Sequence, residues 1–173
     1  MNIKNSKGFT LVEILISVVI LAMAIVPFIG VFTSGIKGGG VAQKIVIGNN
    51  LVQDLMEEIR SKKFDEDPGS PTSPGQLGPE QQESRDNTPP NNFDDVDDYN
   101  GYSDSPPEEV DGTVMAEYSE YSRSAIVEYV TEDDFNIIAS EITDFKRITV
   151  TLTWDGGEQS IIFVTVVGNY ARE

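Results

Sequence analysis

The chain has 173 residues and a formal net charge of −17, from 29 acidic and 12 basic residues, and it contains neither histidine nor cysteine. This balance argues strongly against a nucleic acid partner and against docking on anionic lipid through a basic surface, since both need clustered Lys and Arg. The missing residue types exclude disulfides, thiolate catalysis, zinc sites of the Cys/His type and His-based triads, and we expect no enzymatic activity.

The N-terminal segment is built to enter a membrane. Residues 1–8 are short, polar and basic, and residues 14–32 carry no charge. Nineteen residues form a helix of roughly 28 Å, close to the thickness of the hydrocarbon core of a bilayer. A buried core helix is the alternative. The segment differs from an ordinary secretory signal because its apolar run is longer and its small residue, Gly8, comes before the run.

Two helical segments are expected to follow the leader. We expect residues 9–36 to form the membrane helix and residues 37–64 to continue as an amphipathic helix packed on a folded domain. Pro27, Gly30 and the three glycines that end at Gly40 predict a helix kink or a locally melted stretch between residues 27 and 40. The apolar face of the amphipathic helix recurs at helical spacing, at Val41, Ile45, Val52, Leu55 and Ile59.

The middle of the chain, residues 65–122, is acidic and rich in Pro and Gly. Between residues 64 and 122 the sequence has 16 acids and a single base, Arg85. Residues 65–92 contain too few apolar side chains to offset the entropy of ordering, so we expect a mobile loop there.

The last segment, residues 123–173, predicts an antiparallel sheet. Thr149, Thr151 and Thr153 alternate with apolar residues at a period of two, and a turn at residues 155–158 leads to the next strand. We expect an α+β fold in which one face of this sheet packs on the amphipathic helix. The predicted strands are Ser124–Val130, Asn136–Ile142, Phe145–Trp154 and Gln159–Val167.

The stretch SKGFTLVEILISVVIL resembles the cleavage and methylation motif of type IV prepilins and of type II secretion pseudopilins. The resemblance implies a type IV pilin-like fold and leader cleavage by prepilin peptidase between Gly8 and Phe9, followed by N-methylation of Phe9. Three further segments are similar to minor pilins, the last of them also to minor pseudopilins: NLVQDLMEEIRSKKFDE, FDDVDDYNGYSD (as in minor pilins of the mannose-sensitive haemagglutinin type) and FKRITVTLTWDGGEQSIIFVTVV. The cysteine pair of many major pilins is missing, which favours a minor subunit.

Glu13 is the one charged residue close to the start of the apolar run. A carboxylate in apolar surroundings is costly unless it is paired, although a helix N-terminus favours it. The resemblance implies that Glu13 pairs with the Phe9 ammonium of a neighbouring subunit and fixes the register of helix packing. The same chain's amine is the alternative partner.

The resemblance also implies partners and a location. The partners are other pilin or pseudopilin subunits, prepilin peptidase, an assembly platform protein and, indirectly, an assembly ATPase, because this chain has no phosphate-binding Gly-rich loop. The location is the bacterial inner membrane, single-pass, with the leader cytoplasmic and the C-terminal domain periplasmic, until assembly into an extracellular fibre or a periplasmic pseudopilus.

The acidic block contains a candidate metal site. Clustered carboxylates supply the oxygen ligands that Ca²⁺ prefers, although their spacing here does not fit an EF-hand. The alternative is a solvated acidic loop that keeps fibres soluble. Val96, Tyr99 and Tyr102 shift the balance slightly toward the metal site, since they can anchor the block to the sheet. The candidate ligands are Asp94, Asp95, Asp97 and Asp98.

Three functions remain open from the sequence. The first is a minor pilin, a structural subunit of a type IV pilus. The second is a minor pseudopilin of a type II secretion system, with the same N-terminal chemistry. The third is a single-span, membrane-anchored module that binds a cation or another ligand through the acidic block.

Overall fold

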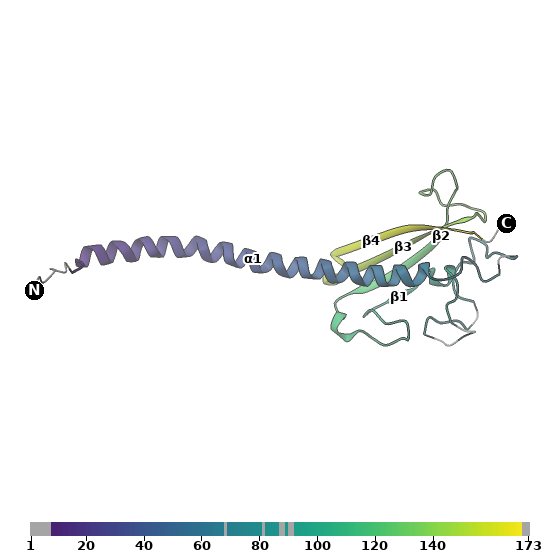
Figure 1. Ribbon diagram of the computed structural model, residues 1–173, viewed down its shortest axis with the longest axis horizontal. Helices are drawn as coiled ribbons and strands as arrows, with labels where there is room; N and C mark the ends of the chain where they lie inside the picture. The colour runs from purple at the N-terminus through teal and green to yellow at the C-terminus, as the bar shows by residue number, and fades with distance from the viewer. Residues whose placement is uncertain (1–7, 68, 81, 87–88, 90–91, 171–173) are drawn as a thin grey trace, which may run out of the picture. The chain divides into compact units, whose positions relative to one another are not determined.

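The computed structural model of the chain describes residues 8–67, 69–80, 82–86, 89 and 92–170. The predicted α+β class is confirmed: one long helix precedes a four-stranded sheet (Figure 1). Contacts within the chain divide it into two compact units, Met1–Ile45 and Val46–Glu173, which are described separately below. The elements are α1 (Leu11–Arg60), η1 (Asp97–Tyr99), β1 (Ser103–Asp104), η2 (Ala116–Tyr118), β2 (Ser122–Tyr129), β3 (Phe145–Trp154), η3 (Asp155–Gly157) and β4 (Gln159–Gly168).

Helix α1 runs without a break through Pro27 and through the three glycines that end at Gly40. The locally melted stretch predicted between residues 27 and 40 was therefore wrong, while the kink predicted at Pro27 and Gly30 stays a prediction. Each backbone group left unpaired in apolar surroundings costs several kcal/mol. This exceeds the cost of about 1 kcal/mol for each glycine in a helix, so the continuous helix is favoured.

The first unit presents apolar side chains to its surroundings. Within the described residues, α1 is the one helix long and apolar enough to cross a membrane. Val41 and Ile45 are also exposed, with 57% and 41% of their surface accessible, so the predicted amphipathic face does not begin at residue 41. The core residues contributed by α1 begin further along the helix and are Leu51, Val52, Leu55, Met56 and Ile59.

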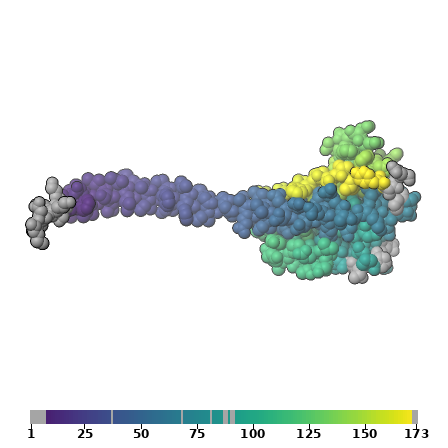
Figure 2. All heavy atoms as spheres, in the orientation of Figure 1, coloured from purple at the N-terminus to yellow at the C-terminus, as the bar shows by residue number. Residues whose placement is uncertain are grey.

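The sheet of the second unit is antiparallel throughout, with the strand order β1-β2-β3-β4. Strand β3 lies between its two long neighbours, and its residues alternate between buried and half-buried. One face packs the buried row of β3 against the core residues of α1, as predicted. In Figure 2, β4 (yellow) borders the blue C-terminal part of α1. The buried residues of β3 are Lys146, Ile148, Val150, Leu152 and Trp154.

The strand predicted at Asn136–Ile142 was wrong. This segment forms turns and a single bridge between Val130 and Ile138. Asp134 accepts a hydrogen bond from the Asn136 amide at 2.9 Å, and Arg147 Nη1 donates to the Asn136 carbonyl at 3.1 Å. Because side chains already bind these backbone groups, they cannot pair with a neighbouring strand.

Part of the predicted loop at residues 65–122 is core. Phe93, Val96 and Tyr99 are buried against α1 and the sheet, which confirms the expected anchoring of the acidic block. Strand β1 adds an edge to the sheet, and its Asp104 forms a buried ion pair with Arg123 at 2.5 Å. Sequence analysis missed this edge because a two-residue strand has no periodicity to detect.

Gly48 allows α1 to approach the sheet closely. A Cβ placed on Gly48 would lie 3.0 Å from Ile161 Cδ1 and 3.1 Å from Leu152 Cδ2, closer than side chains normally pack. The helix therefore touches β3 and β4 here through its backbone.

We predict that Gly48→Val lowers the free energy of unfolding by about 1–3 kcal/mol, because overpacking forces the core apart. Gly40→Val is the matched control, since a Cβ there has no atom within 4 Å. Unfolding of the full-length chain in detergent can be followed through the fluorescence of Trp154, the only tryptophan. Equal stability of the two variants would contradict the packing argument.

Candidate functional site

The predicted cleavage site lies just before the first turn of α1. Gly8, Phe9 and Thr10 are outside the helix and exposed, with 84% of Phe9 accessible. A Cβ built on Gly8 would meet nothing within 4 Å. No contact inside the described chain therefore requires glycine at this position, so any requirement for it comes from a binding partner. The rest of the predicted leader, residues 1–7, lies outside the described residues.

Glu13 is paired within its own chain. Its Oε2 accepts hydrogen bonds from the Thr10 amide and from the Thr10 hydroxyl, both at 2.9 Å. Thr10 Oγ1 in turn accepts the Glu13 amide at 3.3 Å. This reciprocal arrangement is a capping box, which satisfies two backbone donors at the start of a helix. The sequence Thr-x-x-Glu before an apolar run carries this signal, and sequence analysis missed it.

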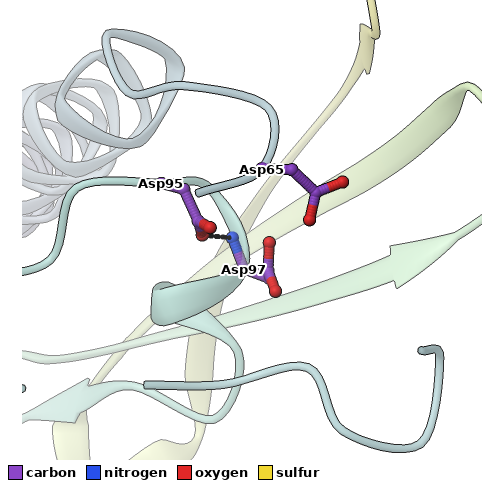
Figure 3. Close-up of side chains that lie close together, drawn as sticks. All are labelled: Asp65, Asp95 and Asp97. Atoms are coloured by element: carbon purple, nitrogen blue, oxygen red, sulfur yellow. Dashed lines mark hydrogen bonds between the residues drawn. The ribbon is translucent and has the colours of Figure 1, made fainter. Parts of the chain in front are cut away.

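The structure divides the four predicted metal ligands among three groups of carboxylates. Asp95 and Asp97 come together with Asp65, a residue that sequence analysis did not consider (Figure 3). Asp94 and Asp98 lie in other groups, which contain glutamates of residues 66–83. The four aspartates therefore do not form one site, although they are close together in the sequence. Residues of a 3₁₀ turn point in different directions.

Lys146 holds the group of Asp65, Asp95 and Asp97. Its ammonium is fully buried and lies 2.5 Å from Asp97 Oδ1 and 3.4 Å from Asp65 Oδ1. It also donates to the Phe64 carbonyl at 2.6 Å and sits 4.5 Å from the centre of the Phe64 ring. A buried cation with these partners already neutralises charge where a metal ion would bind.

Asp95 organises the turn η1. Its Oδ1 accepts the amides of Asp97 and Asp98, at 2.9 and 3.3 Å. Burial, with the nearby charges of Asp97 and Asp98, raises the pKa of Asp95 to about 8. This raised pKa favours the neutral form of the Asp95 carboxyl, which limits the repulsion inside the group. This group is best described as a structural cluster centred on Lys146.

Another buried ion pair, between Arg85 and Glu58, connects α1 to the acidic segment. Arg85 donates two hydrogen bonds to Glu58, at 2.8 and 2.6 Å, and Tyr99 Oη donates to the same carboxylate at 2.6 Å. Burial opposes ionisation of Glu58, but the hydrogen bonds from Arg85 and Tyr99 outweigh it and lower the pKa. The single base of residues 64–122 thus holds its segment on the helix.

We predict that Lys146→Met lowers the free energy of unfolding by about 3–5 kcal/mol, because it leaves Asp97 and Asp65 buried without a counter-charge. Lys63→Met is the matched control. Lys63 pairs with Asp94 at 2.6 Å but its side chain is 61% exposed, and such surface pairs contribute little to stability. Guanidinium unfolding of the full-length variants measures both. A small loss for Lys146→Met would show that the cluster is not a structural anchor.

Comparison with protein families gives one match. The prokaryotic N-terminal methylation motif matches residues 3–29, which include Gly8, Phe9, Glu13 and the first turns of α1. No curated protein and no solved structure matches the chain.

Proposed function

We propose that this chain, which carries at residues 3–29 the signature of type IV prepilins and pseudopilins, is a minor pilin: a structural subunit incorporated into a type IV pilus through α1. The methylation motif supports a type IV pilin or pseudopilin precursor, and it points to a structural subunit instead of an enzyme. The choice of a minor pilin rests on the three further segments that resemble minor pilins and on the missing cysteine pair. The α+β fold is consistent with the pilin fold, and the apolar α1 suggests membrane anchoring.

Prepilin peptidase would cleave between Gly8 and Phe9 and methylate the new amine of Phe9. Two observations support this step. The bond lies in exposed, non-helical backbone, as a protease requires, and nothing within the described chain explains a glycine at position 8. A residue without Cβ lets a catalytic pair approach the peptide closely.

Cleavage would change the surroundings of Glu13. Before cleavage, the Thr10 cap satisfies the carboxylate inside its own chain. Afterwards, the charged amine of Phe9 is a stronger partner, because it adds the attraction of a full opposite charge to its hydrogen bond with the Glu13 carboxylate. In a fibre of packed helices, the amine of one subunit can pair with Glu13 of the next. An assembly platform protein and an ATPase would supply extraction and force.

Mass spectrometry of the native N-terminus tests processing. We expect the chain isolated from membranes or fibres to begin at N-methylated Phe9. A chain that keeps Met1 would contradict the proposal. Gly8→Leu should block cleavage while the chain still inserts in the membrane; efficient processing of this variant would remove the argument from Gly8.

Glu13→Val tests the pairing. We expect normal membrane insertion and at least a tenfold loss of the chain from pili sheared off the cell surface, measured by immunoblotting. Thr10→Val is the matched control, because it removes the capping hydroxyl but keeps the carboxylate, and it should assemble. Equal loss in both variants would assign Glu13 to helix capping. If the wild-type chain is absent from surface pili and present in an envelope fibre, it is a pseudopilin.

A further inference from the structure

Three groups of carboxylates bring oxygens within 4.8 Å of one another in the described part of the chain. The group with Asp65 contains the ammonium of Lys146. The group of Glu66, Glu83 and Asp94 is partly neutralised, because Asp94 pairs with Lys63 at 2.6 Å. The third group is formed by Glu80, Glu83 and Asp98. Among the described residues, no ion pair with Lys or Arg involves any of these three.

Asp98 gives the third group a buried and fixed ligand. Only 1% of its surface is accessible, and its Oδ2 accepts the amides of Asp94 and Asp95, at 2.8 and 3.0 Å. Its other oxygen, Oδ1, is buried and has no hydrogen-bond partner. An unpaired buried carboxylate oxygen is costly. Asp65, Asp95 and Asp97 also have one such oxygen each, but their group contains the Lys146 ammonium, whereas the group of Asp98 has no ion pair among the described residues.

The two glutamates complete the group from the other side. The Glu80 amide donates to Glu83 Oε2 at 3.2 Å, which holds the two residues together. Three carboxylates whose oxygens lie within 4.8 Å of one another repel when all are charged, and a cation between them would remove this repulsion. Glu80 is exposed and Glu83 is half-buried, so an ion can enter from solvent.

We propose that Glu80, Glu83 and Asp98 bind a Ca²⁺ ion. Oxygens that all lie within 4.8 Å of one another fit around an ion with ligand distances of about 2.4 Å, which is the distance typical of Ca²⁺. Three carboxylates, mono- or bidentate, supply three to six oxygens, and water completes the shell. Mg²⁺ fits less well, because it requires ligands at about 2.0–2.1 Å in octahedral geometry.

The ion would connect two segments that are distant in sequence. Asp98 belongs to η1, which is part of the core, whereas Glu80 and Glu83 belong to the Pro/Gly-rich stretch with little apolar content. Binding would therefore fix that stretch on the domain and reduce the local charge from −3 to −1. The site differs from the predicted one, since it keeps Asp98 and replaces the other three aspartates with glutamates.

Calorimetric titration of the full-length chain in detergent, after treatment with a chelator, tests the site. We expect one Ca²⁺ per chain with a Kd of about 10⁻⁴ to 10⁻³ M, in the range of extracellular calcium modules, and at least tenfold weaker binding of Mg²⁺. Ca²⁺ should also raise the melting temperature. No heat and no thermal shift at 10 mM CaCl₂, or equal affinity for the two metals, would overturn the proposal.

Glu80→Gln and Glu83→Gln should each weaken Ca²⁺ binding at least tenfold, and Asp98→Asn should weaken it further. Glu66→Gln is the matched control, since it removes the same charge from the neighbouring group and should bind like the wild type. A loss for Glu66→Gln as large as for Glu80→Gln would assign the ion to the other group and overturn this one. Glu80 is exposed and Glu83 is half-buried, so their variants should fold and decide the test even if Asp98→Asn does not fold.

Discussion

The buried ammonium of Lys146 is the interaction on which the second unit depends. It comes from the central strand β3, and it binds the backbone of Phe64 just after α1 and the carboxylate of Asp97 in the acidic block. The Lys146 ammonium therefore connects the sheet, the end of the helix and the acidic segment. A buried charge of this kind is costly unless every partner is in place, so it allows one arrangement of the three segments and penalises others.

The same principle explains how so acidic a segment folds. Among the described residues, three nearly or fully buried bases hold it: Arg85 binds Glu58, Arg123 binds Asp104, and Lys146 binds Asp97. The aromatic and apolar residues of the block then complete the core. Acids beyond the reach of these bases must be solvated, protonated or bound to a cation. The raised pKa of Asp95 favours the second of these states for its carboxyl group.

Elements with a strong local signal were predicted from the sequence. Strand β3 was predicted with its observed bounds and β4 to within one residue, because alternation and the turn at residues 155–158 are local properties. The apolar run of α1 was equally clear. The segment at residues 136–142 has the composition of a strand, but Asp134 and Arg147 bind its backbone instead. The partners of the acidic block, Asp65 and Lys146, could not be predicted, since they are 32 and 49 residues from Asp97 and depend on tertiary packing. Glu80 and Glu83 were missed for the same reason.

The bond between Lys146 and the Phe64 carbonyl has a mechanical consequence. A subunit held in a fibre by its N-terminal helix would bear any pull on its domain through α1. Within the second unit, that load would pass to the sheet through Arg123, which donates to the Leu51 carbonyl, and through Lys146, which donates to the Phe64 carbonyl thirteen residues after Leu51. These two buried cations bind the backbone near the start of the core segment of α1, at Leu51, and just beyond the end of α1, at Phe64. The domain would thus resist being peeled from the helix starting at either end.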